Sequence, residues 1–209
     1  MVQSQPTRRG RPRADEVEAR KAALLDAAMD TLKEMGVEAI TMSAVAARAG
    51  ASKATLYAWF GSREGLLTAV VERESEKSVR SVRAGLETSA PAEATLRDYC
   101  VGLLTMLTSP ESIALNRASM TSAELAHVLL RSGRHRVGPL VEEFMRGAAE
   151  RGELTVTDPA DAYRELWGLA VRDTQIRVLL GEPSPTPEEI DEAATVAMEQ
   201  FMAAHRPSA

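Results

Sequence analysis

Three glycines, at positions 36, 50 and 61, restrict the fold of the first third of the chain more than any other feature. Apolar residues at helical spacing run from Asp15 up to Gly36, a residue type that ends helices in the left-handed conformation. The glycines then leave intervals of 13 and 10 residues, each of which has room for one short helix. A further apolar-periodic run begins at Arg63. The sequence therefore predicts one longer helix, two short helices and a second long helix.

Proline marks the remaining helices. Pro91, Pro110, Pro159 and Pro187 each precede or open an apolar-periodic run, which is typical of prolines in the first turn of a helix. The stretch LTVTD at 154–158 is too short and isolated to indicate more than a connector. We therefore expect an all-α protein whose larger part contains five or six helices.

The charge is distributed unevenly along the chain. The net charge is −5, yet residues 1–65 carry 10 Lys and Arg against 8 Asp and Glu. The first 13 residues contain four arginines and no acid. A partly basic N-terminal third on an acidic body indicates a local anionic partner.

Several other classes of protein have little support. No apolar run approaches the length of a membrane span and no secretory signal is visible, so we expect a cytoplasmic protein without a membrane partner. The one cysteine, Cys100, leaves no disulfide or thiolate cluster and has no evident base partner. His127, His135 and His205 show no metal-ligand spacing, and no phosphate-binding loop or dinucleotide fingerprint is present. We expect no cofactor and no metal, and an all-α enzyme is the weakest alternative.

The second short helix, from about Ser52 to Phe60, has two unlike faces. If Leu56 points inward, Phe60 lies on the same side, whereas Ala54 and Ala58 face outward. We expect Lys53, Thr55 and Tyr57 to flank that outer face and Trp59 to lie at its border, pointing outward. Small outward residues would let the helix approach a DNA major groove closely, as in a helix-turn-helix.

Residues 41–67, TMSAVAARAGASKATLYAWFGSREGLL, resemble the DNA-binding domain of the TetR family of bacterial transcriptional regulators. The matching positions are Thr41, Ala49-Gly50, Ser52, Thr55-Leu56-Tyr57, Trp59-Phe60, Arg63 and Leu66-Leu67. Three positions depart from the usual pattern: Ala51 stands where Val is common, Trp59 where His or Tyr is common, and Arg63 where Lys is usual.

The resemblance implies a double-stranded DNA operator as partner and assigns roles to individual residues. Contacts to bases or to the adjacent backbone would come from Lys53, Ala54, Thr55 and Tyr57. Phosphates would be held by Thr41, Trp59 and Arg63.

The N-terminal arm adds a second candidate DNA contact. Arg9-Gly10-Arg11-Pro12 resembles the core of the AT-hook motif, in which glycine brings the backbone close to the minor groove. Arg9 and Arg11 would then enter a narrow A·T tract, whose negative potential attracts arginine. The alternative is a solvated basic tail.

For the larger half, the resemblance implies a small-molecule effector pocket and a homodimer formed by the last two helices, about 159–181 and 187–204. Apolar residues at steps of three and four make the second of these a candidate interface helix: Ile190, Ala194, Ala197, Met198 and Phe201. Candidate effector-binding residues are Tyr99, Cys100, Met106, Arg117 and Trp167.

The sequence thus predicts four parts: a flexible basic arm (1–14), a helix-turn-helix domain (15–62), a connecting helix (63–90) and a ligand-binding and dimerisation domain (91–209). The implied function is a ligand-responsive transcriptional regulator, a repressor released from a palindromic operator by a small molecule. An architectural protein that binds A·T tracts through the arm is the alternative within DNA-binding proteins.

Overall fold

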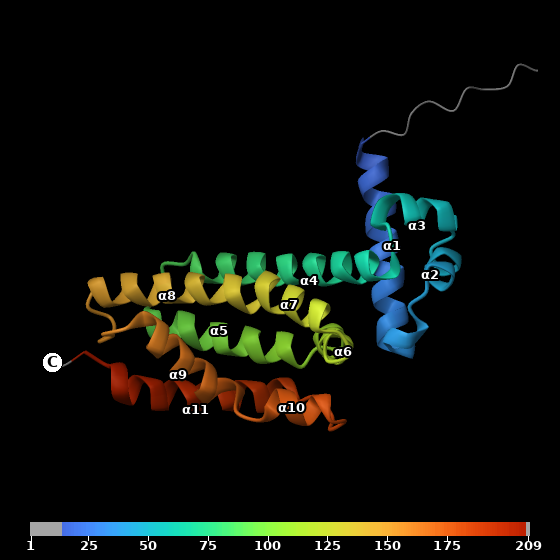
Figure 1. Ribbon diagram of the computed structural model, residues 1–209. Helices are drawn as coiled ribbons and strands as arrows, with labels where there is room; N and C mark the ends of the chain where they lie inside the picture. The colour runs from blue at the N-terminus through green and yellow to red at the C-terminus, as the bar shows by residue number, and fades with distance from the viewer. Residues whose placement is uncertain (1–13, 208–209) are drawn as a thin grey trace, which may run out of the picture.

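The structure, a computed structural model, describes residues 14–207 and is all-α, as predicted, with no strand among those residues. Figure 1 shows the helices of residues 14–60 gathered at one end of the molecule, with the long helix that follows them leading into the larger part. The helices are α1 (Ala14–Met35), α2 (Met42–Arg48), α3 (Lys53–Phe60), α4 (Arg63–Leu86), α5 (Ala92–Leu107), α6 (Pro110–Ser119), α7 (Ala123–Ser132), α8 (Arg134–Glu150), α9 (Pro159–Val171), α10 (Thr174–Leu179) and α11 (Pro187–His205), with a 3-10 turn at Val37–Ala39. Within residues 14–207, none of these helices combines the length and apolar character needed to cross a membrane.

Local capping explains where the short helices begin and end. The predicted cap Thr41 accepts a hydrogen bond from the Ala44 amide over 3.1 Å, and Ser62 does the same for Gly65. The three predicted stop glycines all have positive φ, between 61° and 80°. Gly65 has a separate requirement, because a Cβ there would lie 2.0 Å from the carbonyl oxygen of Phe60. The absence of a side chain at Gly65 therefore lets the start of α4 lie close to the end of α3.

The described part of the chain after residue 91 contains seven α-helices, more than the five or six that we predicted. Two interruptions account for the difference. Gly133 separates α7 from α8, and the predicted helix over 159–181 breaks at Arg172, which has φ 46°. The break lets α10 turn and pack against α6.

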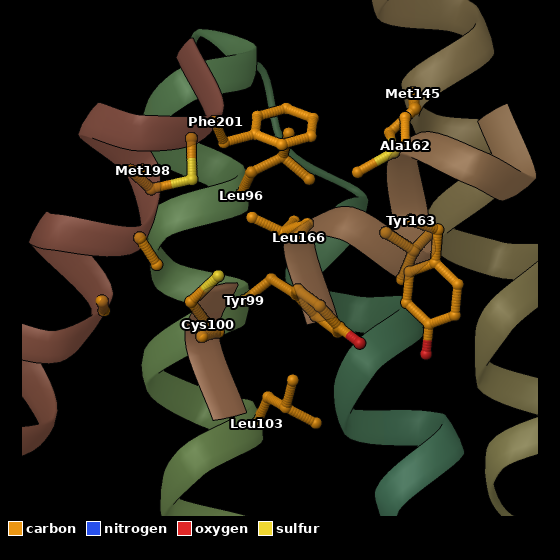
Figure 2. Packing of buried hydrophobic residues seen from close by; sticks show 14 of the residues in the cluster. Leu96, Tyr99, Cys100, Leu103, Met145, Ala162, Tyr163, Leu166, Met198 and Phe201 are labelled. Carbon is orange, nitrogen blue, oxygen red and sulfur yellow. The ribbon is translucent and has the colours of Figure 1, made fainter. Parts of the chain in front are cut away.

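Buried residues form two clusters. The first, here called the N-terminal cluster, joins α1 to α4 and also takes in residues of two later helices: Leu115 and Ala118 from α6, and Leu125 and Val128 from α7. The second, the C-terminal cluster, lies between α4, α5, α8, α9 and α11. Figure 2 shows part of it, with Phe201 and Met198 of α11 packed near Leu96 of α5.

The C-terminal cluster corrects one expectation about α11. The apolar residues that we predicted to form a dimer interface are buried in the protomer's own core instead: Ile190, Ala194, Ala197, Met198 and Phe201. They pack mainly against α5 and α9. A dimer through α11 would have to use its opposite face.

Candidate DNA-binding surface and internal cavity

Helix α3 begins at a well-formed cap. The Ser52 hydroxyl accepts a hydrogen bond from the Thr55 amide over 3.1 Å, and the two side-chain oxygens are 2.9 Å apart. Because Thr55 is tied to the cap, only its methyl group and one face of its hydroxyl remain available to another molecule. The cap fixes the start of α3 without using the side chains of Lys53, Ala54 or Tyr57.

The two faces of α3 are as predicted. Leu56 is fully buried in the N-terminal cluster, whereas Lys53, Ala54 and Ala58 are exposed. Tyr57 is 54% exposed although it is a large aromatic residue. An exposed tyrosine beside two alanines and a lysine presents methyl groups, a hydroxyl and a cation. These are the groups with which a helix contacts bases and phosphates in a major groove.

Trp59 differs from the expectation that it points outward. Its side chain is half-buried and packs against the N-terminal cluster, and Phe60 beside it is also only half-buried. Both rings lie where α3 packs against the N-terminal cluster. The indole N–H of Trp59 is thus a less direct candidate for a phosphate than the hydroxyl of Tyr57.

Thr41 and Arg63, both candidate phosphate ligands, are placed differently. Thr41 is exposed, and its hydroxyl oxygen accepts the capping bond while its proton can still be donated. Arg63 instead donates to two backbone carbonyls, those of Ile40 and Val37, each over 2.7 Å. This guanidinium stabilises the fold, because it supplies a partner to the Ile40 carbonyl and a second one to the Val37 carbonyl, which also accepts from the Ile40 amide.

The electrostatics of α2 and α3 favour an anion. No Asp or Glu occurs between Glu38 and Glu64, an interval that contains three cations. Arg63 is occupied as described, and Arg48 forms a bidentate pair with Glu34, with bonds of 2.6 and 2.7 Å. Lys53 has no ion pair within the described residues and is therefore the available charge on this surface. Arg9 and Arg11 of the arm lie outside the described residues.

The larger half contains a cavity of about 520 Å³ between α4 and the helices from α5 to α10. A second cavity of about 370 Å³ adjoins it. The two share lining residues from α4 and α5: Lys77, Ser78, Val82, Leu103 and Met106. The volumes suit a small organic molecule.

Three of the five predicted effector-binding residues line these cavities. Met106 lines both, Tyr99 lines the smaller and Trp167 lines the larger. Cys100 does not line either cavity; it is fully buried in the C-terminal cluster, and burial raises the pKa of its thiol to about 12. Arg117 is also elsewhere, because its guanidinium donates to the carbonyls of Val178 and Leu179 at the end of α10, over 3.1 to 3.2 Å.

Sequence reasoning missed Arg134, Gln175 and the α4 residues that line the larger cavity. The run Arg134-His135-Arg136 directly after Gly133 is a usable signal, because a helix start without an acid is unusual. The pattern over residues 63–90 predicts only a connecting helix, so it gives no indication that α4 contributes to the cavity wall.

Comparisons with known proteins agree with this arrangement. The chain is 32% identical over 109 residues to the uncharacterized HTH-type transcriptional regulator YdeS of Bacillus subtilis, a match that covers 52% of this chain and only 51% of YdeS. The crystal structure of a TetR transcriptional regulator from Agrobacterium tumefaciens has 31% identity and a TM-score of 0.73, over 90% of this chain and 95% of that one. A TetR-family regulator from Mesorhizobium loti has the same fold, with a TM-score of 0.83 at 21% identity over 90% and 98% of the two chains.

Family models match both halves of the molecule. Residues 24–70 match the bacterial regulatory proteins of the tetR family. Residues 94–207, more than half of the chain, match the C-terminal domain of AefR-like transcriptional repressors. With a helix-turn-helix whose second helix faces outward and an α-helical domain around an internal cavity, the chain belongs to the TetR family of transcriptional regulators, as residues 41–67 had indicated.

Proposed function

We propose that this protein is a homodimeric transcriptional repressor that binds a palindromic operator through α3 and is released when a small molecule fills the internal cavity. The observation that carries the proposal is the outward face of α3, where Lys53, Ala54 and Tyr57 are exposed while Leu56 holds the opposite face in the core. The match to the C-terminal domain of a repressor family supports repression, in preference to activation, of transcription.

We assign base and backbone contacts to Lys53, Ala54, Thr55 and Tyr57. The hydroxyl of Thr41 donates its proton to a phosphate next to these contacts. Either alanine suits the methyl group of a thymine, and lysine and hydroxyl groups suit phosphates and base edges. Arg63 has no part in this assignment, because its guanidinium is occupied by carbonyls of the fold.

A second copy of the chain would bind along α9, α10 and α11. Two large apolar residues at α10 support this surface: Ile176 within the helix is 47% exposed, and Leu180, which directly follows it, is 81% exposed. Gly168 on α9 is exposed as well, and nothing lies within 4 Å of where its Cβ would be. A partner helix can approach closely there. A two-fold axis would place the two α3 helices about one DNA turn, roughly 34 Å, apart.

The cavity can act on α3 because the same helices serve both ends of the molecule. Residues of α4 enter the N-terminal cluster at Leu66 and Val70 and line the cavity at Ser75 and Ser78. Leu115 of α6 does both at once, since it belongs to the N-terminal cluster and lines the larger cavity. A ligand that displaces α4 or Leu115 therefore shifts the packing beneath the helix-turn-helix.

The coupling required is modest. A 100-fold loss of operator affinity corresponds to about 2.7 kcal/mol, which lies within the ordinary allosteric range. By reciprocity, operator DNA must lower the affinity for the effector by the same factor.

Selection of genomic fragments bound by the purified protein, followed by footprinting, tests the proposal. We expect discrete protection with two-fold symmetry and half-sites one helical turn apart. Diffuse protection of A·T tracts would instead indicate an architectural protein, and absence of any selected fragment would reject the DNA-binding role.

A further inference from the structure

The charged residues that line the larger cavity are not equally neutralised. Glu74 accepts hydrogen bonds from Arg73 over 3.0 Å and from Lys77 over 2.9 Å. Glu111, at another point of the wall, accepts one from Lys33 over 2.7 Å. Arg134 is the exception, because within residues 14–207 no carboxylate is paired with it. Among the charged residues that line the larger cavity, Arg134 is therefore the one without an ion-pair partner in the described part of the chain.

The guanidinium of Arg134 is held in place by an aromatic ring. Its Cζ lies 4.1 Å from the ring centre of Trp167, which also lines the cavity. A cation stacked on an indole keeps its edge N–H groups available while its flat face is covered. Arg134 also begins the 17-residue helix α8, whose first turn contains no acid, so the positive end of the helix adds to the same charge.

Two buried tyrosine hydroxyls lie near Arg134 and near each other. Tyr99 and Tyr163 are only 7% and 4% exposed. Neither phenol oxygen has a partner at normal hydrogen-bond distance, but each phenol shifts the pKa of the other, so the two hydroxyls are close neighbours. Figure 2 shows both oxygens turned away from Phe201 and the C-terminal cluster around it. Burial raises the pKa of both phenols, while the charge of Arg134 acts in the opposite direction on each. Both phenols therefore remain protonated donors close to an unpaired cation.

Tyr163 is held in this position by the packing of α9 on α8. A Cβ at Gly138 would come within 3.2 Å of Cε1 of the Tyr163 ring, so the absence of a side chain at Gly138 lets the ring lie against α8. Tyr163 and Trp167 also meet edge to face, with ring centres 6.2 Å apart. The arrangement keeps the two aromatic rings and the guanidinium together.

Serine and amide side chains also line the larger cavity, but most of the surface that its wall exposes is apolar. The apolar lining residues of the larger cavity are Val82, Leu103, Met106, Leu107, Leu115, Leu129, Leu130, Val137 and Trp167. A ligand that fills this space needs an apolar body, and an ionic ligand without one would leave most of the wall uncovered.

We propose that the effector is an organic carboxylate with an apolar body, whose carboxylate is bound by Arg134 in the larger cavity. The planar guanidinium matches a carboxylate in two-point geometry. The apolar body lies along α5 and α6, where it contacts Leu103, Met106 and Leu115. This inference rests on the proposed function, in that it takes the cavity to be the effector site.

Calorimetric titration of the full-length protein without DNA tests the carboxylate directly. The probes are two matched pairs, octanoate with octanol and naphthoate with naphthol, which differ in the acidic group. We expect the acid of at least one pair to bind about tenfold or more tightly than its alcohol, the factor typical of a hydrogen-bonded charge. Equal affinity within both pairs, or no binding of either acid at millimolar concentration, would overturn the proposal.

Variants locate the binding group. Arg134→Gln should weaken the acid about tenfold or more and leave the alcohol unchanged, and Arg134→Lys should give an intermediate loss because the two-point geometry is removed. Arg146→Gln is the matched control, since Arg146 lies on the same helix and does not line either cavity. Circular dichroism checks that each variant is folded. If Arg134→Gln does not fold, the affinity of Arg134→Lys for the acid tests the role of Arg134 instead. Unchanged acid binding in the folded variant would reject the role of Arg134.

The outcome is separable from that of the proposed function. If the protein binds a specific operator but neither acid binds, the carboxylate proposal is rejected and the proposed regulatory function stands. If an acid binds but no DNA fragment is selected, the proposed regulatory function is rejected and the carboxylate site stands.

Discussion

The guanidinium of Arg63 donates its Nε–H to the carbonyl oxygen of Ile40 over 2.7 Å. A second bond from the same group, from Nη2, reaches the Val37 carbonyl over 2.7 Å. Ile40 is fully buried and directly precedes Thr41, the cap of α2. The first residue of α4 therefore holds the segment that sets where α2 begins.

Arg63→Lys separates this structural role from a phosphate contact. Lysine keeps the charge but cannot donate in two directions from one plane, so we expect the free energy of unfolding to fall by about 1–2 kcal/mol. Urea unfolding measures the change, with Arg83→Lys on the same helix as the control. Unchanged stability together with weaker operator binding would favour the phosphate role that the family resemblance implies.

Tyr57→Ala tests the outward face of α3. The side chain is already 54% exposed, so its removal should leave the fold and the dimer intact. Loss of a hydrogen-bonding aromatic contact of ~1–3 kcal/mol predicts operator affinity at least about tenfold lower. Gel shift beside sedimentation measures both properties, and Tyr57→Phe divides the effect between the ring and the hydroxyl. Binding like that of the wild type would remove Tyr57 from the interface.

Deletion of residues 1–13 tests the arm, which lies outside the described residues. If Arg9 and Arg11 neutralise phosphates in the minor groove, operator binding should weaken. The salt dependence should also flatten, by about 0.9 in slope for each phosphate that the protein no longer neutralises. Gel shifts over a range of salt concentrations give both quantities. If affinity and slope stay as they are in the full chain, the arm is a solvated tail.

Replacement of Ile176 and Leu180 by lysine tests the dimer surface on α10. Both side chains are exposed in the protomer, at 47% and 81%, so the double variant should fold normally. Two like charges brought together across a two-fold axis should shift the protein towards monomer in sedimentation and weaken operator binding. Met35→Lys, another exposed apolar position but at the end of α1, is the control. A double variant that remains a dimer would place the interface elsewhere.

Cys100 predicts a loss of stability in alkali. Its pKa is raised by burial to about 12, above the value near 9 of a free thiol, so the folded chain holds this proton where the unfolded chain has lost it. The contribution is complete below pH 9 and is lost as pH rises from 9 to about 12. Cys100→Ala should make the pH dependence of unfolding less steep in that range. The native thiol should also resist alkylation until the protein is unfolded; rapid modification of the folded protein would contradict its burial.

Much of the helix-turn-helix could be predicted from the sequence because its determinants are local. The cap at Thr41 and the stop at Gly50 depend on residues within one turn of each other. The periodicity that placed Leu56 inward and Ala54 outward likewise needs nothing beyond the helix itself. Local hydrogen bonding and side-chain spacing were therefore sufficient to locate the candidate DNA-binding face.

Only the tertiary structure decided which groups meet across the chain. The periodicity of α11 showed that Ile190 and Phe201 share a face, but not that α5 and α9 bury it within the protomer. Arginine side chains are long and can reach several partners, so Arg117 binds carbonyls of α10 rather than a ligand, and Arg134 lies on Trp167 beside the cavity. A periodic pattern specifies that a face is apolar; which element covers it, and what space is left between elements, depends on how the helices pack over long distances in the chain.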